Sequence, residues 1–202
     1  MTEPASLRDA LIDVGIALLD EGGMSALTLR RTAARAGVSH AAPAHHFQGL
    51  PGLLTAIAAR AFQKFCTAMD VARDKAAPDR FARLNGICQG YLDFARDHAG
   101  LFHLMFVSAE VDRADPDLRE ASARAYLILR TACLPFAKPD ATEDAPLEVA
   151  VWSLVHGFAL LGFSQPHSQP RPLTNLPAFA DLLTRLIAGT QSNPLATPPP
   201  MR

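Results

Sequence analysis

Three histidines, His40, His45 and His46, fall within one seven-residue stretch of the sequence. Imidazole side chains can ligate a metal, carry a proton, or donate hydrogen bonds to phosphates and base edges. His45 and His46 are adjacent, so on a helix they point in different directions and do not converge on one ion. We therefore predict no metal site and interpret these histidines as hydrogen-bond donors.

The three cysteines, Cys66, Cys88 and Cys133, are widely spaced, and no CxxC pair occurs. Zinc knuckles and thioredoxin-type couples need such pairs, so neither is predicted. An odd and sparse set of cysteines is typical of a reducing compartment, which favours a cytoplasmic protein. Cys66 as a redox sensor remains an alternative to a buried and inert thiol.

The sequence lacks the short motifs of the common enzyme classes. No glutamate is followed three residues later by a histidine, as a helical di-iron site requires. The nucleophile-elbow, phosphate-loop and dinucleotide-binding motifs are also absent. We therefore predict that the protein is not an enzyme and uses no cofactor.

Composition argues for a folded and soluble chain. The 202 residues are 49% hydrophobic and 19% charged, and the formal net charge is −1. This balance excludes binding to nucleic acid through bulk positive charge alone, but it allows a local site. The first residues lack the apolar region of a signal peptide, and His, Gly or Ser interrupts the longest apolar stretches. We therefore expect no membrane partner.

Apolar residues recur with a helical period along almost the whole chain. Leu7, Leu11, Val14 and Leu18 mark one face of a first helix, which Gly22-Gly23 ends. Further helices are expected at 29–36, 40–47, 51–75, 80–97, 100–108, 117–134, 145–163 and 175–189. The prediction is an all-α fold of about nine helices, divided near residue 48 and followed by a Pro-rich tail.

The stretch most informative for function is Thr28–Phe47, TLRRTAARAGVSHAAPAHHF. It predicts two short helices that meet at a tight turn around Gly37, with Thr28 and Ser39 as their caps. This arrangement is typical of a helix-turn-helix, in which the first helix braces a second one in the major groove of DNA. An ordinary helical hairpin with a glycine turn has the same local spacing and stays open at this point.

Two separate motifs resemble the TetR family of transcriptional repressors. The spacing Thr28-(7 residues)-Ala36-Gly37-Val38-Ser39-(6 residues)-His46-Phe47 resembles its N-terminal signature. The runs YLDFARDHAGLFHLMF at 91–106 and VWSLVHGFALL at 151–161 resemble the C-terminal domain of a subgroup with a Trp-His-Gly signature, here Trp152, His156 and Gly157. The resemblance implies a helix-turn-helix domain over 1–48, a ligand-binding and dimerisation domain over 49–190, and a disordered tail over 191–202.

The resemblance implies a repressor that binds DNA and is released from it by a small molecule. Thr28 would hold a helix N-terminus near a phosphate, and Arg30 would contact phosphate or base, with a solvated surface arginine as the alternative. His46 and Phe47 are expected to pack against the first and fourth helices. The implied DNA-binding residues are Thr28, Arg30, Ser39, His40, Ala41, Ala42, Ala44 and His45.

Two departures from the family pattern weaken the expected DNA affinity. Ala44 and Leu50 stand where many relatives have a Tyr and a Lys that reach phosphates. Residues 39–50 contain neither Lys nor Arg, and five arginines among the first 60 residues are balanced by five acidic residues. Phosphate contacts supply much of the affinity for DNA. A small-molecule-binding protein with weakened or lost DNA binding is therefore the alternative function.

The C-terminal half is expected to hold a cavity for an apolar or aromatic molecule, because aromatic residues and methionines gather there. For each such residue an ordinary core position is the alternative. His156 has a second interpretation, as a side chain that satisfies a buried hydrogen bond near the dimer interface. The candidate lining residues are Phe62, Phe65, Cys66, Met69, Tyr91, Phe94, Phe102, Met105, Phe106, Trp152, His156 and Phe158.

A homodimer is expected from the same half of the chain. The helix at 145–163 is apolar on nearly every side, which is typical of a helix buried on both faces. One face can cover the cavity while the other meets a partner, and the helix at 175–189 completes a four-helix interface. Two-fold symmetry then predicts a pseudo-palindromic operator.

The histidines predict that operator affinity depends on pH. Histidine is the side chain that gains charge between pH 8 and 5, so protonation of His40, His45 and His46 should strengthen DNA binding in mild acid. Gel-shift titrations across this range would measure the effect, and an operator affinity that stays flat would contradict it.

Overall fold

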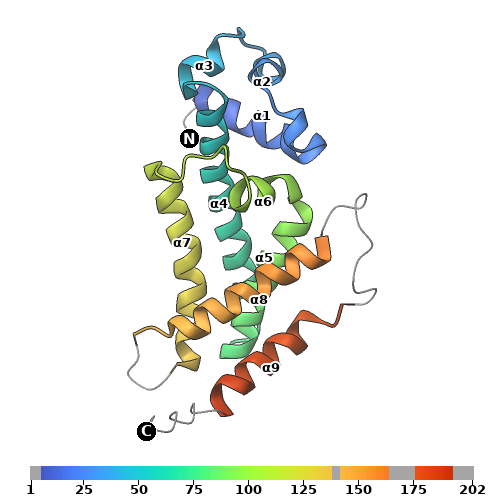
Figure 1. The fold of residues 1–202 in the computed structure, drawn as a ribbon, viewed down its shortest axis with the longest axis vertical. Helices are drawn as coiled ribbons and strands as arrows, with labels where there is room; N and C mark the ends of the chain where they lie inside the picture. The colour runs from blue at the N-terminus through green and yellow to red at the C-terminus, as the bar shows by residue number, and fades with distance from the viewer. Residues whose placement is uncertain (1–5, 138–141, 164–175, 193–202) are drawn as a thin grey trace, which may run out of the picture.

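The computed structural model describes residues 6–137, 142–163 and 176–192, which form helices and contain no strand (Figure 1). The α-helices are α1 (Leu7–Gly22), α2 (Leu29–Ala36), α3 (Ala42–Phe47), α4 (Leu50–Lys75), α5 (Arg80–Asp97), α6 (Ala99–Phe106), α7 (Pro116–Cys133), α8 (Ala145–Phe163) and α9 (Phe179–Ser192). The all-α prediction is confirmed. Of the tail predicted at 191–202, the first two residues end α9 and the rest lie outside the described residues.

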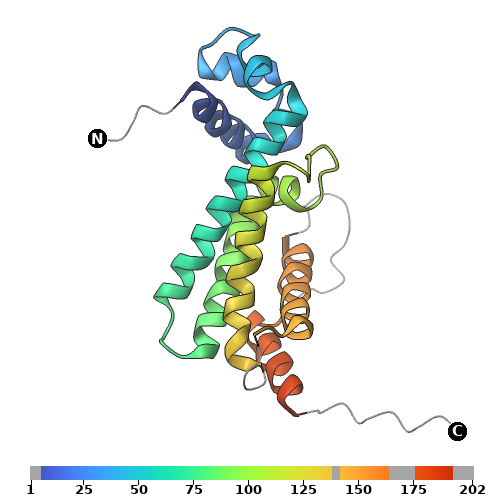
Figure 2. The same cartoon turned by 90° about the vertical axis from the view of Figure 1, so that its left-hand side faces the viewer.

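The helices form two groups along the long axis of the molecule. Helices α1, α2 and α3 cluster at one end, around the start of α4 (Figure 1). Helix α4 then runs beside α5 and α7, and both views show these three helices packed lengthwise (Figure 2). Helices α8 and α9 cover the other end, where α8 contacts α5 and α7 and α9 contacts α8. The domain boundary predicted near residue 48 falls just before α4 and stays a prediction.

Local capping explains where the first helices begin. The Ser6 hydroxyl accepts a hydrogen bond from the Asp9 amide at 3.2 Å, and the Thr28 hydroxyl accepts one from the Arg31 amide at 3.1 Å. Each bond satisfies an amide that the first turn of a helix leaves unpaired. Gly37 ends α2 in the left-handed conformation with φ +69°, as the tight turn predicted.

The predicted cap at Ser39 is wrong. Helix α3 begins only at Ala42, after Ala41, and no side chain caps it. Ser39 instead lies in a turn, where its carbonyl oxygen accepts a hydrogen bond from the Ala42 amide at 3.0 Å. Pro43 stands in the first turn of α3, where its missing N–H leaves no bond unmade, so the helix begins there and not at His40.

Two turns of α4, near its start, are buried on every side. All residues from Leu53 to Ala59 are buried, and α1, α3, α6 and α7 all contact α4. Gly15 of α1 lets Ile57 approach, because a Cβ at position 15 would lie 2.5 Å from the Ile57 Cδ1. The N-terminal helices and the larger helical part therefore share α4 as a common core element.

Helix α8 exposes one face in the single chain. Leu147, Val151 and Val155 are buried, whereas Val149 is 54% and Trp152 41% exposed. The exposed face is the one predicted to meet a partner, and its burial in a dimer stays a prediction. The window Ala145–Gly162 has a mean hydropathy of 1.4 and is long enough to cross a membrane by length and composition, although Ser153, His156 and Gly157 interrupt its apolar residues as expected. The core helix of a soluble protein passes the same test.

Helix α9 begins at Phe179, four residues after the predicted start at 175. Pro177 stands just before it, and a proline disfavours the helical conformation of the residue that precedes it. Phe179 and Leu183 are buried, and the Phe179 ring packs edge-on against Phe158 with ring centroids 5.3 Å apart. Phe158 therefore joins α8 to α9.

We predict that Gly90→Ala destabilises the protein by about 1–3 kcal/mol. A Cβ at position 90 would lie 2.5 Å from the Ala68 carbonyl oxygen, so α5 and α4 would have to separate. Urea unfolding at fixed protein concentration measures the change. The control is Gly189→Ala in α9, where a Cβ meets nothing within 4 Å and the substitution should be neutral or stabilising. Equal effects of the two substitutions would contradict the close contact.

Candidate functional site

The end of the molecule formed by α2 and α3 presents a polar face. Seven of the eight residues implied to bind DNA are exposed and Ala42 is half-buried; the exposed ones are Thr28, Arg30, Ser39, His40, Ala41, Ala44 and His45. The expectation that His46 packs against the first and fourth helices is wrong, because His46 is exposed. Phe47 is buried, and the Arg8 guanidinium lies 5.4 Å from its ring centroid.

Two of the five arginines among the first 60 residues pair with carboxylates within the chain. The Arg35 guanidinium binds both carboxylate oxygens of Glu21 and thereby lowers the pKa of Glu21. Arg60 pairs with Asp9 at 2.6 Å and with Asp13 at 3.2 Å. Because Arg35 and Arg60 are paired, the positive charge that faces outward is smaller than the arginine count implies. Within the described residues, Arg30 makes no ion pair.

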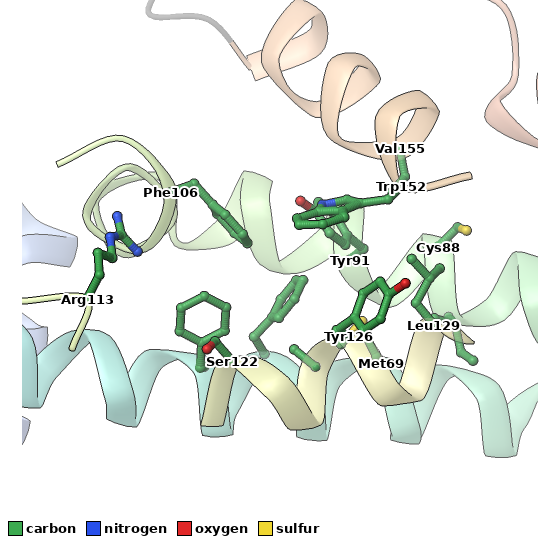
Figure 3. A pocket seen from close by; sticks show the side chains of 14 residues that line it. Met69, Cys88, Tyr91, Phe106, Arg113, Ser122, Tyr126, Leu129, Trp152 and Val155 are labelled. Atoms are coloured by element: carbon green, nitrogen blue, oxygen red, sulfur yellow. The ribbon is translucent and has the colours of Figure 1, made fainter. Parts of the chain in front are cut away.

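The larger helical part encloses an apolar cavity of about 230 Å³ between α4, α5, α7 and α8 (Figure 3). A cavity of about 150 Å³ can hold benzene, so this one has room for a larger molecule. Its lining residues are Phe62, Phe65, Met69, Ile87, Cys88, Tyr91, Phe106, Arg113, Ser122, Ala125, Tyr126, Leu129, Trp152 and Val155.

Half of the twelve candidate lining residues line this cavity, namely Phe62, Phe65, Met69, Tyr91, Phe106 and Trp152. The others lie outside its wall. Phe94 and Phe102 form a layer behind it, with ring centroids 5.3 Å from Phe65 and 5.8 Å from Tyr91, respectively. Cys66 and Met105 are fully buried in the core, Phe158 contacts Phe179, and His156 lies behind Tyr91.

Tyr91 and His156 form a hydrogen-bonded pair at the wall of the cavity. The Tyr91 hydroxyl lies 2.6 Å from the His156 Nδ1. Burial raises the pKa of Tyr91 and lowers the pKa of His156, so the tyrosine keeps its proton and the imidazole stays neutral. We therefore assign the hydroxyl as donor and Nδ1 as acceptor. This bond fits the interpretation of His156 as a side chain that satisfies a buried partner.

Sequence reasoning missed the contribution of α7 to the cavity. Ser122, Ala125, Tyr126 and Leu129 lie on one face of that helix, at the spacing of neighbouring turns. The spacing is visible in the sequence, but α7 contains no methionine and Tyr126 is its one aromatic residue, so it lacks the gathering of aromatic residues and methionines that marks α4, α5 and α6. Arg113, in the loop before α7, carries no periodic signal at all.

Tyr126 of α7 binds a buried carboxylate on α8. Glu148 of α8 is only 2% exposed, and the Tyr126 hydroxyl donates to its Oε2. The Asp144 amide donates to its Oε1 at 3.1 Å, so both carboxylate oxygens are satisfied. The hydrogen bond to Glu148 raises the pKa of Tyr126. The Tyr126 hydroxyl is therefore engaged outside the cavity although its ring lines the wall.

The cysteines have the character of core side chains. All three are buried, and burial raises the pKa of the Cys66 thiol to about 11 and that of Cys133 to about 12. The thiolate is the reactive form, so raised pKa values make these thiols poor nucleophiles. This burial argues against Cys66 as a redox sensor. Within the described residues, no group of three His, Cys, Asp or Glu side chains is arranged to hold a metal ion.

Two parts of the sequence match one family. Residues 11–61 match the bacterial regulatory proteins of the tetR family, and residues 84–186 match the tetracyclin repressor-like C-terminal domain. The second match alone covers 103 of the 202 residues. The chain belongs to the TetR family. No curated protein matches its sequence.

Solved structures share the TetR fold over nearly the whole chain. A protein of unknown function from Rhodococcus sp. RHA1 is 25% identical, with a TM-score of 0.68 and coverage of 93% of this chain and 94% of that chain. The TetR family transcriptional regulator PfmR from Thermus thermophilus is 17% identical, with a TM-score of 0.58 and coverage of 92% and 95%. LfrR from Mycobacterium smegmatis, in complex with proflavine, is 18% identical, with a TM-score of 0.57 and coverage of 95% and 99%.

These matches establish the TetR-type arrangement of an N-terminal helix-turn-helix domain and a C-terminal helical domain. The family consists of bacterial regulatory proteins, and the neighbours PfmR and LfrR are transcriptional regulators. Membership of the Trp-His-Gly subgroup, predicted from Trp152, His156 and Gly157, stays a prediction. Within the described residues, a Cβ at Gly157 would meet nothing within 4 Å, so this glycine does not serve close helix packing inside one protomer.

We predict that His156 makes this TetR-family chain less stable in mild acid. Its pKa in the folded state lies below that in the unfolded chain, so the unfolded chain binds the proton more readily. The stabilising contribution is fully present above about pH 6.5 and declines as the pH falls below that value. His156→Gln should reduce the loss of unfolding free energy between pH 7 and 5.

The control for this prediction is His103→Gln, because His103 is exposed on α6. Urea unfolding at several pH values compares the two variants with the parent protein. A His156→Gln variant whose pH profile matches the parent would show that the imidazole does not titrate as its burial implies.

Proposed function

We propose that the protein is a ligand-responsive DNA-binding transcriptional regulator, a repressor that an apolar or aromatic small molecule releases from its operator. The observation that carries the proposal is that one helix, α4, both lines the cavity and contacts the helices of the DNA-binding part. Phe62, Phe65 and Met69 of α4 line the cavity, while its first turns contact α1 and α3. A ligand that displaces the aromatic wall therefore acts on the element that supports the helix-turn-helix.

A second contact supports this coupling at the junction of the two parts. The Asp112 amide donates to the Thr55 hydroxyl at 3.0 Å, and that hydroxyl donates to the Pro51 carbonyl oxygen at 2.8 Å. Asp112 is adjacent to Arg113, which lines the cavity. The loop between α6 and α7 thus bridges the cavity and the first turn of α4, so a ligand-induced shift of the loop reaches the DNA-binding end.

The proposed assembly is a homodimer formed through α8 and α9, within a cytoplasmic protein. Val149, Trp152 and Leu160 leave an apolar strip of α8 exposed, with 54%, 41% and 43% of each residue accessible. Large apolar side chains in one strip are typical of a surface that a partner covers. A two-fold axis at this strip would pair two recognition helices and thus match a pseudo-palindromic operator.

Helix α3 and its flanking turn are proposed to meet the major groove. His40 and His45 would donate to phosphates or base edges, the Ala41, Ala42 and Ala44 methyls would contact bases, and Thr28, Arg30 and Ser39 would lie at the DNA backbone or base edges. The ion pairs of Arg35 and Arg60 favour weak binding, as does the lack of Lys and Arg over 39–50. Because of this low positive charge, the second candidate function is that of a ligand-binding protein that does not bind DNA.

Arg30→Ala tests the proposal. We expect it to weaken binding to DNA that flanks its own coding region by about 10-fold or more, and to reduce the salt dependence by about one counterion, because Arg30 makes no ion pair within the described part of the chain. The measurement is a gel-shift titration at several salt concentrations, with sedimentation to follow the assembly.

The matched control is Arg83→Ala, an exposed arginine at the far end of α5, which should bind DNA as the parent does. Loss of binding in both variants would point to a general charge effect and argue against the proposed face. A parent protein that binds none of this DNA while it still binds ligands would support the second candidate.

A further inference from the structure

The polar groups of the cavity are separated along its length. Arg113 lies at one end beside Phe106 and Ser122, whereas Tyr126 lies towards the other end near Leu129 (Figure 3). The wall between them is formed by aromatic and aliphatic side chains. A ligand that fills this space therefore meets one cationic group, at one end only.

The Arg113 guanidinium is held in place by neutral acceptors. It donates to the Met105 carbonyl oxygen at 2.5 Å and to the Ser108 carbonyl oxygen at 3.4 Å, at the C-terminal end of α6. These bonds orient the side chain but leave its charge uncompensated. A guanidinium has five N–H donors, so donors remain for a further partner.

No carboxylate of the described residues pairs with Arg113, although acidic residues lie close in sequence. The Asp112 carboxylate accepts from the Ala114 amide at 2.9 Å, and the Asp115 carboxylate accepts from the Leu118 amide at 2.9 Å. By contrast, Arg60 and Arg96 each pair with aspartates at 2.6–3.2 Å. Arg113 is thus an oriented, solvent-exposed cation beside an apolar cavity, and the nearby Asp112 and Asp115 carboxylates bind backbone amides and form no ion pair with it.

Among the described residues, the other end of the cavity offers no free cation. Glu148 lies buried behind Tyr126, whose hydroxyl donates to it, and the Arg130 Nε lies 4.0 Å from its Oε1. An anionic group therefore finds no partner at this end and is attracted to Arg113. The two ends therefore favour one orientation of a ligand that carries a single negative charge.

We propose that the ligand of this cavity is a small carboxylic acid with an apolar, ring-containing body, and that Arg113 binds its carboxylate. Guanidinium and carboxylate match in geometry and charge. Tyr91, Phe62, Phe65 and Phe106 surround the apolar body. The inference rests on the proposed ligand-binding function of the cavity and adds the chemical class of the ligand.

Trp152 provides the readout, because it is the only tryptophan of the chain and lines the cavity. The probes are 4-phenylbutanoate and its neutral amide, 4-phenylbutanamide, which have the same shape and differ in charge. Titrations of the full chain, followed by Trp152 emission and by calorimetry, should give about 10-fold tighter binding of the acid.

Arg113→Gln should remove this preference and leave the affinity for the amide within about threefold of the parent. Arg113→Lys should keep part of it, since the charge remains while the fork of donors is lost. The control is Arg119→Gln, which removes an equal charge from an exposed position of α7 and should change neither affinity. Circular dichroism checks that α6 persists when the two carbonyl bonds are lost.

The outcomes separate the two proposals. Equal binding of the acid and the amide, or a preference that survives Arg113→Gln, would overturn the carboxylate assignment and leave the cavity as a site for neutral ligands. Failure of both probes to bind the parent protein would count against the ligand-binding function itself, and the carboxylate assignment would fall with it.

Discussion

The structure depends on the complete burial of two turns of α4, residues 53–59. Residues 53–59 are buried without interruption, which a single helix achieves only when other helices surround it. Helices α1 and α3 supply part of that cover, and α6 and α7 supply the rest. Because one stretch of helix is the core of both parts, neither part can shift along α4 without changing contacts in the other. The proposed signal transfer between the cavity and the helix-turn-helix would depend on this shared core.

The charge distribution of the DNA-binding end follows from how its helices are held together. Glu21 and Arg35 join the end of α1 to α2, and Asp9 and Asp13 of α1 hold Arg60 of α4. These pairs position the helices, but they consume arginines that could otherwise face phosphate. The same arginines would thus be needed to position the helices and to bind DNA phosphates. The short helix α3, with its histidines and alanines, therefore presents most of the surface that would face DNA.

The rings of the aromatic cluster also form much of the cavity wall. Phe65 meets Tyr91 and Phe106 edge to face, as Phe62 meets Phe106, whereas Tyr91 and Phe106 stack with ring centroids 6.3 Å apart. Phe94, Phe102 and His156 support those rings from behind. On the side of α5 and α6 the wall consists of packed aromatic rings. On the side of α7 and α8 it consists of smaller or partly exposed side chains.

The sequence by itself determined the helices, the tight turn at Gly37 and the family, because helical periodicity, capping residues and local spacing are properties of neighbouring residues. It also identified the aromatic residues of the C-terminal half, but it did not distinguish those that line the cavity from those behind it. That distinction, the pairing of Arg35 and Arg60, and the lack of a carboxylate partner for Arg113 among the described residues were decided by tertiary structure. Each depends on which side chains from distant segments meet, and the distances between such segments are set only when the helices pack around α4.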